Sequence, residues 1–159
     1  MRFLTASALL AVLAVAPVAH ARLGESLKVI SERYGRPNSQ PNKATAMWLF
    51  EEGGGQVVYT VTFNAQGVSI AEGFKPRRNA VLSQRTAETF ISDQLVVRGK
   101  SNGGREVRPG ENFTFGGKQF TCGAEEYVFV DEPADVMVLW QRSYPASIIV
   151  LSREMVAAM

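Results

Sequence analysis

The sequence is poorest in the two residue types that carry much of catalytic and metal chemistry, with one histidine and one cysteine among 159 residues. The histidine, His20, lies in an N-terminal stretch that we expect to be removed. The remaining chain would have no Ser-His-Asp triad, no Cys-His pair and no imidazole ligand for a metal. A single cysteine, Cys122, excludes an intramolecular disulfide. We therefore expect no cofactor, no metal site and no enzyme.

An excess of charge of one sign is also lacking, because 17 Lys and Arg residues face 15 Asp and Glu residues. This balance gives no electrostatic reason to expect nucleic acid as a partner. Two basic groups stand out, and both are interpreted first as solvated loops. They are Lys75, Arg77 and Arg78, and then Arg98, Lys100, Arg105 and Arg108.

The first 21 residues, MRFLTASALLAVLAVAPVAHA, have the pattern of a signal peptide. Arg2 supplies a positive start, Leu9 to Val15 are apolar, and Ala19-His20-Ala21 is an A-x-A cleavage pattern. We expect cleavage before Arg22 and a periplasmic or secreted protein. An uncleaved anchor is the weaker alternative, since the apolar stretch is short for a bilayer. The rest of the chain has no second long apolar run, so we expect no membrane span after cleavage.

Residues 22–159 are predicted to form a single α+β domain, in which two short helices pack on a mainly antiparallel sheet. Ser26 is the expected N-cap of a helix that Gly35 and Pro37 end, with Tyr34 on its apolar face. Strands are expected at 45–52, 56–64 and 68–74, and a second helix at 82–96 with Ser83 as its N-cap. After a long polar loop over 97–110, further strands are expected within 111–122 and at 126–131, 135–142 and 146–152, before a helical tail. This order also suggests a tandem α-βββ duplication with halves 22–78 and 79–159.

The hairpin within 111–122 has a predicted register. A two-residue turn at Gly116-Gly117 pairs Phe115 with Lys118 and Phe113 with Phe120. The same register places Glu111 opposite Cys122, on the phenylalanine face. We interpret Cys122 first as buried and inert; an intermolecular disulfide and a reactive thiol are the open alternatives.

The N-terminal motifs carry a resemblance to a known family. Gly24-x-Ser26, Tyr34-Gly35-x-Pro37, an aromatic strand with Trp48 and Phe50, and the run VTFNAQGVSI are similar to the start of small bacterial envelope proteins of the BamE (SmpA/OmlA) type. The helix-and-sheet plan also resembles the β-lactamase-inhibitor-protein fold, which carries two such repeats. The resemblance implies a non-catalytic envelope protein that binds another protein.

Two groups of residues are candidates for binding such a partner. Trp48, Phe50 and Trp140 would be anchors if they lay on an exposed sheet face, although a place in the core is favoured. Arg98, Lys100 and Arg105 belong to the polar loop that would project if the protein were an inhibitor.

We thus carry two hypotheses from different classes. The first is an exported protein-binding module of the cell envelope, acting as a monomer or weak dimer. The second is a secreted inhibitor of an extracellular enzyme, or a small hydrolase that relies on carboxylates without histidine. The acidic doublets Glu51-Glu52, Glu125-Glu126 and Asp131-Glu132 are not such catalytic pairs alone, because neighbours on a strand point to opposite faces.

Overall fold

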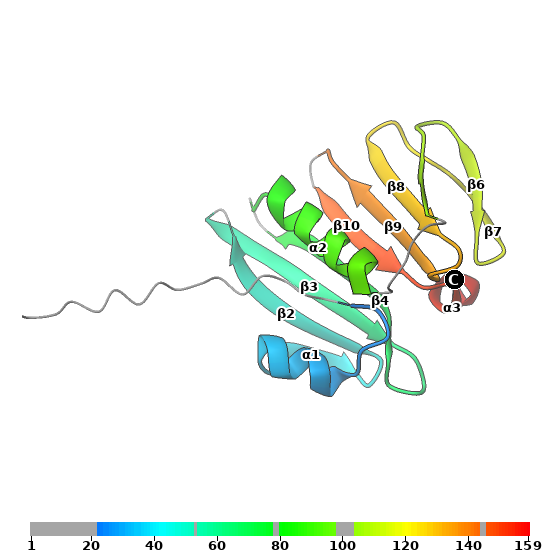
Figure 1. The fold of residues 1–159 in the computed structure, drawn as a ribbon. Coiled ribbons are helices and arrows are strands. Elements are labelled where there is room, and N and C mark those ends of the chain that lie inside the picture. Colours follow the sequence, from blue (N-terminus) through cyan, green and yellow to red (C-terminus); the bar gives the residue numbers. More distant parts are fainter. Residues whose placement is uncertain (1–21, 53, 78–79, 98–103, 144–145) are drawn as a thin grey trace, which may run out of the picture.

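The computed structural model describes residues 22–52, 54–77, 80–97, 104–143 and 146–159, and Figure 1 shows their arrangement. Three helices and ten strands occur in these residues. The helices are α1 (Leu27–Tyr34), α2 (Gln84–Val97) and α3 (Arg153–Ala158). The strands are β1 (Ser39–Asn42), β2 (Thr45–Glu52), β3 (Gly55–Phe63), β4 (Ser69–Arg77), β5 (Arg105–Val107), β6 (Asn112–Phe115), β7 (Lys118–Thr121), β8 (Glu126–Asp131), β9 (Val136–Gln141) and β10 (Ser147–Leu151).

Eight of the strands form one sheet in the order β1-β2-β3-β4-β10-β9-β8-β5, and every neighbouring pair is antiparallel. The predicted α+β class with a mainly antiparallel sheet is confirmed. Strands β4 and β10 join the two halves of the chain, with Phe74 opposite Ile148 and Ala71 opposite Leu151. The first half thus supplies α1 and four strands of the large sheet, and the second half supplies α2, four strands of that sheet and, in addition, the β6–β7 hairpin and α3. A duplication as the origin of this arrangement stays a prediction.

Local sequence signals explain where the first two helices begin and end. The Ser26 hydroxyl accepts a hydrogen bond from the Val29 amide at the start of α1, and Gly35 follows the helix with a φ of 79°. Only glycine adopts that left-handed conformation without steric cost. The Ser83 hydroxyl accepts from the Thr86 amide at the start of α2. The predicted roles of Ser26, Gly35 and Ser83 are confirmed, and Pro37 lies just beyond the end of α1.

The sheet has a front face that carries α1 and α2, toward the viewer in Figure 1. Inward alternation in β3 is complete, since Val57, Tyr59, Val61 and Phe63 are all buried. We call the cluster beneath the two helices the front core. Its largest members are Trp48, Tyr59, Phe74 and Phe90.

The opposite, back face is covered over the second half of the sheet by the β6–β7 hairpin and α3. Phe113, Phe115 and Cys122 of the hairpin region pack there against Val128 of β8 and Val156 of α3. We call this cluster the back core. The predicted hairpin register is confirmed, with Phe113 opposite Phe120 and Phe115 opposite Lys118. Hydrogen bonds to the main chain of Cys122 continue it, since the Cys122 amide donates to the Glu111 carbonyl.

Two segments in which the sequence predicts no strand contain strands. β1 lies between α1 and the predicted strand 45–52, and all four of its residues are exposed. β5 lies in the predicted loop 97–110, and only Val107 of its three residues is buried. Both are edge strands held through one neighbour, so neither needs the apolar alternation by which a strand is recognised in sequence.

Candidate functional site

Residues 22–25, which we call the N-terminal segment, cross the front side of the sheet just before α1 and bond to the beginning of β4. The Gly24 amide donates to the Ser69 carbonyl and the Ser69 amide donates to the Glu25 carbonyl, each at 2.8 Å. The Leu23 amide donates to Oε1 of Gln94 on α2 at 3.0 Å. The N-terminal segment is therefore tied to both layers of the front side.

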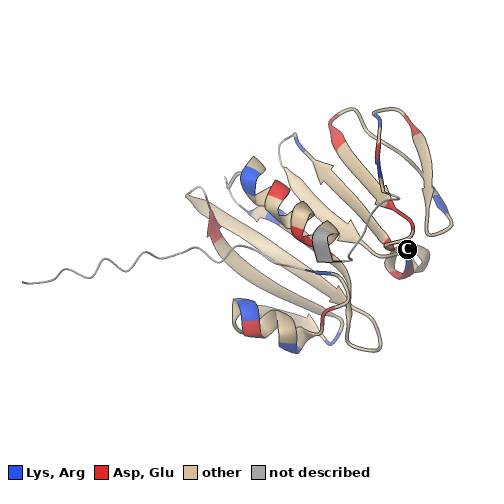
Figure 2. Ribbon diagram, in the orientation of Figure 1, with Lys and Arg blue, Asp and Glu red and all other residues tan. Residues whose placement is uncertain are grey.

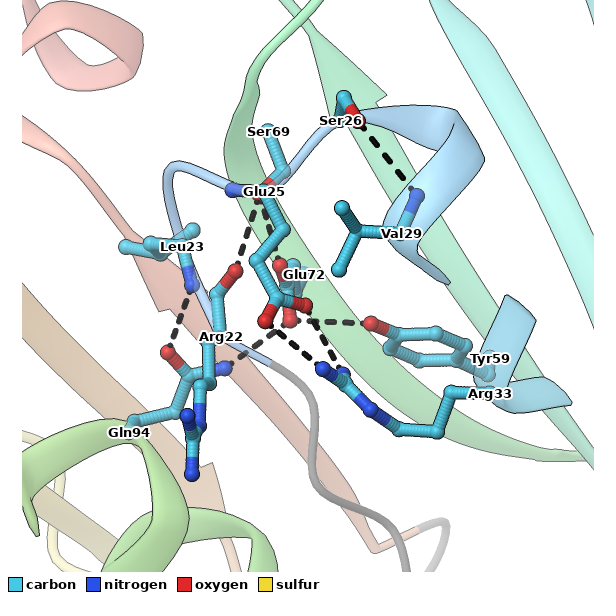
Figure 3. Close-up of polar contacts among 10 residues, drawn as sticks. All are labelled: Arg22, Leu23, Glu25, Ser26, Val29, Arg33, Tyr59, Ser69, Glu72 and Gln94. Atoms are coloured by element: carbon cyan, nitrogen blue, oxygen red, sulfur yellow. Dashed lines mark hydrogen bonds and ion pairs between the residues drawn. The ribbon is translucent and has the colours of Figure 1, made fainter. Parts of the chain in front are cut away.

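A buried carboxyl lies directly beneath this segment, and Figure 3 shows its partners. Glu72 of β4 is 1% exposed. Its Oε2 accepts from the Tyr59 hydroxyl and from Nε2 of Gln94, each at 2.9 Å. Its Oε1 lies 2.8 Å from the Ser69 hydroxyl oxygen. Glu72 thus connects β3, β4 and α2, and through Ser69 and Gln94 it reaches the N-terminal segment.

Burial sets the protonation of this group. Loss of water around Glu72 raises its pKa from the ordinary 4.5 to about 7, although hydrogen bonds from Ser69, Tyr59 and Gln94 oppose the rise, and the nearby Glu25 adds to it. Burial likewise raises the pKa of the Tyr59 hydroxyl, with the Glu72 charge as a second cause. Glu72 therefore changes charge near neutral pH while Tyr59 stays protonated.

An ion pair closes the cluster on the α1 side. Arg33 donates from Nη1 and Nη2 to the two carboxylate oxygens of Glu25, at 2.8 and 2.7 Å. This hydrogen-bonded pairing raises the pKa of the guanidinium further above its ordinary value. Arg33 lies in the last turn of α1, where the helix dipole favours a cation, and its bond to Glu25 is the specific contact.

Aromatic rings surround the polar cluster and keep water out. Tyr59 stacks on Phe74 with 4.9 Å between centroids and meets Tyr34 edge-on at 5.5 Å. The Trp48 indole donates to the Gly35 carbonyl at 2.9 Å, which ties the end of α1 to β2. Tyr34 thus packs on the apolar face of α1, as predicted.

The aromatic candidates for partner binding do not form an exposed surface. Trp48 is 1% exposed and Trp140 is 9% exposed. The Trp140 ring lies under the guanidinium of Arg142, whose Cζ is 5.1 Å from the ring centroid. Phe50 is half-buried and packs on the front core. The hypothesis of an exposed aromatic anchor is therefore wrong for Trp48 and Trp140, because both indoles fill the core.

The basic candidates are only partly within the described residues. Arg98 and Lys100 lie outside them. Arg105 is exposed in β5 and forms an ion pair with Glu111 at 2.6 Å. Hydrogen bonds from the Arg108 amide and the Arg105 side chain lower the pKa of Glu111. Figure 2 shows basic and acidic residues interspersed along the described elements.

Cys122 is buried, as the register predicts. Its sulfur lies 3.6 Å from the Val107 carbonyl oxygen. Burial raises the pKa of the thiol, and the charges of Glu126, Glu111 and Glu106 raise it further. These surroundings suppress the thiolate and so favour the inert interpretation of Cys122.

The acidic side chains of the described residues lie both in the core and around a surface pocket. Glu72 is closed off from solvent beneath the N-terminal segment. An open pocket beside α3 is lined by Glu132, Asp135, Glu154 and Arg153, and Arg153 bonds to Glu132 at 2.7 Å. Within the described ranges, three or more His, Cys, Asp or Glu side chains nowhere gather to hold a metal ion. In the same ranges no helix has the length and apolar character of a membrane span.

The polar cluster around Glu72 is absent from the sequence prediction. One signal for it is available: Glu72 has the same strand parity as the inward Phe74, so an acidic side chain faces the core. Gln94 similarly lies between Ile91 and Leu95 on the apolar stripe of α2. Polar residues at inward positions indicate a buried network, because each must find a partner there.

The fold and the Glu72 cluster define an α+β protein with a buried polar network under a layer of helices. Comparisons with known proteins do not narrow this class further. The chain matches no family model and no curated protein. A solved structure, a cysteine-rich secretory protein from Staphylococcus aureus, aligns with 18% identity over 85% of this chain, with a TM-score of 0.47. The chain spans about half of that protein's length, 46%.

The resemblance to BamE-type and β-lactamase-inhibitor-type proteins is wrong. No model of either family matches the chain. The motifs behind the resemblance, Gly24-x-Ser26 and Tyr34-Gly35-x-Pro37, are a cap and a stop of α1. Such signals recur wherever a short helix precedes a strand, so they do not identify a family.

Proposed function

We propose that this is an exported, non-catalytic module that binds another protein, with residues 1–21 removed as a signal peptide before Arg22. The binding surface is a part of the back face that we call the open face. It is formed by outward-facing, uncharged residues of β2, β3, β4 and β10: Met47, Leu49, Val58, Thr60, Thr62, Gly73 and Ile149.

The exposure of these side chains is the observation that carries the proposal. The hairpin and α3 cover the back face at Ala71 and Leu151, but the back core contains no member from β2 or β3. Ile149, opposite Gly73, is 39% exposed. Half-exposed apolar and threonine side chains lie side by side in the middle of this sheet. Burying them against a partner is favourable, because it removes apolar surface from water.

The composition of the open face favours a protein as its partner. Its central row, Met47, Thr60, Gly73 and Ile149, has no charged side chain. Lys75 lies opposite Val58 in the next row, and Glu51 lies beyond that row. An uncharged centre with charges at the rim is the pattern of protein–protein interfaces, and nucleic acid would require a basic centre. The partner would therefore present an apolar surface of its own to the middle of the sheet.

A photo-crosslinking residue at Thr60 tests the proposal, with the same residue at Glu88 on α2 as the control on the front side. In extracts of the native envelope we expect a discrete adduct from position 60 and none from position 88. Ile149→Arg should abolish that adduct, because it places a charge in the centre of the open face. Val81→Arg, at an exposed valine outside the strands of that face, should leave it unchanged.

The outcomes distinguish specific binding at the open face from non-specific association. Equal adducts from positions 60 and 88, or an adduct that survives Ile149→Arg, would contradict the open face as the binding surface. Both arginine variants must retain the wild-type circular dichroism spectrum and melting temperature, so that loss of the adduct is not loss of the fold.

A further inference from the structure

The Ser69 hydroxyl links the buried carboxyl to the N-terminal segment, and it has more acceptors than it can serve. Its oxygen lies 2.8 Å from Oε1 of Glu72 and 3.2 Å from the carbonyl oxygen of Arg22. The Glu25 amide donates to the same oxygen at 3.2 Å. A serine hydroxyl carries one hydrogen, so it can donate to Glu72 or to Arg22, but not to both.

The protonation of Glu72 decides which bond forms. A neutral Glu72 donates its own proton from Oε1 to the Ser69 oxygen, and the Ser69 hydrogen is then free to donate to the Arg22 carbonyl. Its Oε2 still accepts from Tyr59 and Gln94. In this state each of the three close oxygens, on Glu72, Ser69 and Arg22, takes part in a hydrogen bond.

An ionised Glu72 reverses the Ser69 bond. The carboxylate has no proton to give, so the Ser69 hydroxyl must donate to it, and the Arg22 carbonyl loses its donor from this group. The negative charge also acts on the Glu25 carboxylate, with which it interacts unfavourably. Both effects weaken the attachment of residues 22–25.

Of the side chains around Glu72 whose pKa is displaced, Glu72 is the one that responds to pH near neutrality. The α-amino group that cleavage before Arg22 would create titrates in the same range, and the Glu72→Gln variant separates its effect from that of Glu72. The charged and titratable neighbours come from the N-terminal segment, α1, β3 and α2: Arg22, Glu25, Arg33, Tyr34, Tyr59 and Asp93. Arg33 stays charged and both tyrosines stay neutral between pH 5 and 8, since the pKa of each is raised. The β10 residue opposite Glu72 is the apolar Val150.

We propose that Glu72 is a proton-operated latch for the N-terminal segment: the protonated carboxyl fastens residues 22–25 to the sheet through Ser69, and its ionisation loosens them. The latch is independent of the open face, which lies on the other side of the sheet. Within an exported protein it would make the exposure of the N-terminal segment depend on the pH of its surroundings.

Amide hydrogen exchange of the wild-type protein from pH 5.5 to 8, corrected for intrinsic exchange rates, tests the latch. We expect the protection of Leu23, Gly24 and Glu25 to fall by roughly five- to tenfold relative to Val138 of β9, the loss of about one hydrogen bond. The midpoint should coincide with the titration of Glu72, followed by the ¹³C shift of its carboxyl. Protection that is flat with pH, or a midpoint that differs from the Glu72 titration, would overturn the proposal.

Two variants sharpen the test. Glu72→Gln carries an amide that donates to Ser69 as the neutral acid does, so it should hold the acid-state protection up to pH 8. Ser69→Ala removes the relay and should give weak protection at all pH values. Ser152→Ala, which removes a buried serine cap at the start of α3, is the matched control and should keep the wild-type pH response. A pH response that persists in Glu72→Gln would contradict the latch, and the wild-type titration decides the matter if a variant fails to fold.

Discussion

The front core and the back core lie on opposite faces of one sheet and differ in what they bury. The front core encloses a carboxyl, a tyrosine hydroxyl and an amide that bond to one another. The back core encloses one thiol, Cys122, among apolar side chains. Burial of apolar side chains stabilises the folded protein at any pH. The contribution of a buried carboxyl to stability depends on whether the carboxyl is protonated. We therefore expect the front core's contribution to the free energy of unfolding to depend on pH and the back core's contribution not to.

The largest effect is expected from a cavity in the back core. Phe115 is fully buried, so Phe115→Ala should lower the free energy of unfolding by about 3 to 5 kcal/mol. The loss should be the same at pH 5 and pH 8, because the side chain and its neighbours do not titrate between them. Urea unfolding at both pH values measures it, with the exposed Thr114→Ala on the same strand as control. A loss that changes with pH would show that the two cores are coupled.

The next effect comes from Glu72 in the front core. Its pKa is raised from 4.5 to about 7 in the folded protein, so its stabilising contribution is complete below about pH 4.5 and is lost as the pH rises through 7. The loss amounts to about 3 kcal/mol at alkaline pH. Glu72→Gln should thus be more stable than the wild type by about that amount at pH 8 and nearly equal to it at pH 4.5, in urea unfolding.

The residue opposite Glu72 in β3 supplies a control without a titratable group. Val61 is fully buried, so Val61→Ala should lower the free energy of unfolding. That loss should be equal at pH 4.5 and pH 8. An equal gain from Glu72→Gln at both pH values would contradict the assignment of the pH response to Glu72.

The difference between the two cores also explains what the sequence could predict. The back core follows from periodicity and turns, since Gly116-Gly117 fixes the register that places Phe113, Phe115 and Cys122 on one face. In the front core, the alternation of Val57, Tyr59 and Val61 and the caps Ser26 and Ser83 are likewise local signals. These features need only residues a few positions apart.

The Glu72 cluster needs residues that only the tertiary fold brings together. Gln94 is 22 positions from Glu72, and the Leu23 amide is 71 positions from Gln94. No spacing rule connects a strand glutamate to a helix glutamine across such a separation. The edge strands β1 and β5 escape prediction for a related reason, because a neighbouring backbone rather than a side-chain pattern defines them.

A smaller effect should separate the ion pair of the front side from those of the surface. The side chains of Arg33 and Glu25 are 22% and 16% exposed, whereas those of Arg153 and Glu132 are 51% and 47% exposed. Arg33→Ala should cost about 1 to 2 kcal/mol, and Arg153→Ala below about 0.5 kcal/mol, because water screens the exposed pair. Thermal unfolding at pH 7 compares them, and equal losses would show that burial adds nothing to the Glu25–Arg33 pair.

The smallest effect is expected at Cys122, the counterpart of Glu72 in the back core. Cys122→Ala should cost about 1 kcal/mol in urea unfolding, since it removes one buried sulfur that bonds only weakly to backbone carbonyls. A polar thiol reagent at pH 8 should label the native wild type on the order of 100-fold more slowly than the urea-unfolded chain, because burial both shields the thiol and raises its pKa. Rapid labelling would mean that the back core opens readily to solvent. In that case the hairpin would be as loosely held as we expect the N-terminal segment to be above pH 7, and the contrast between the two sides of the sheet would disappear.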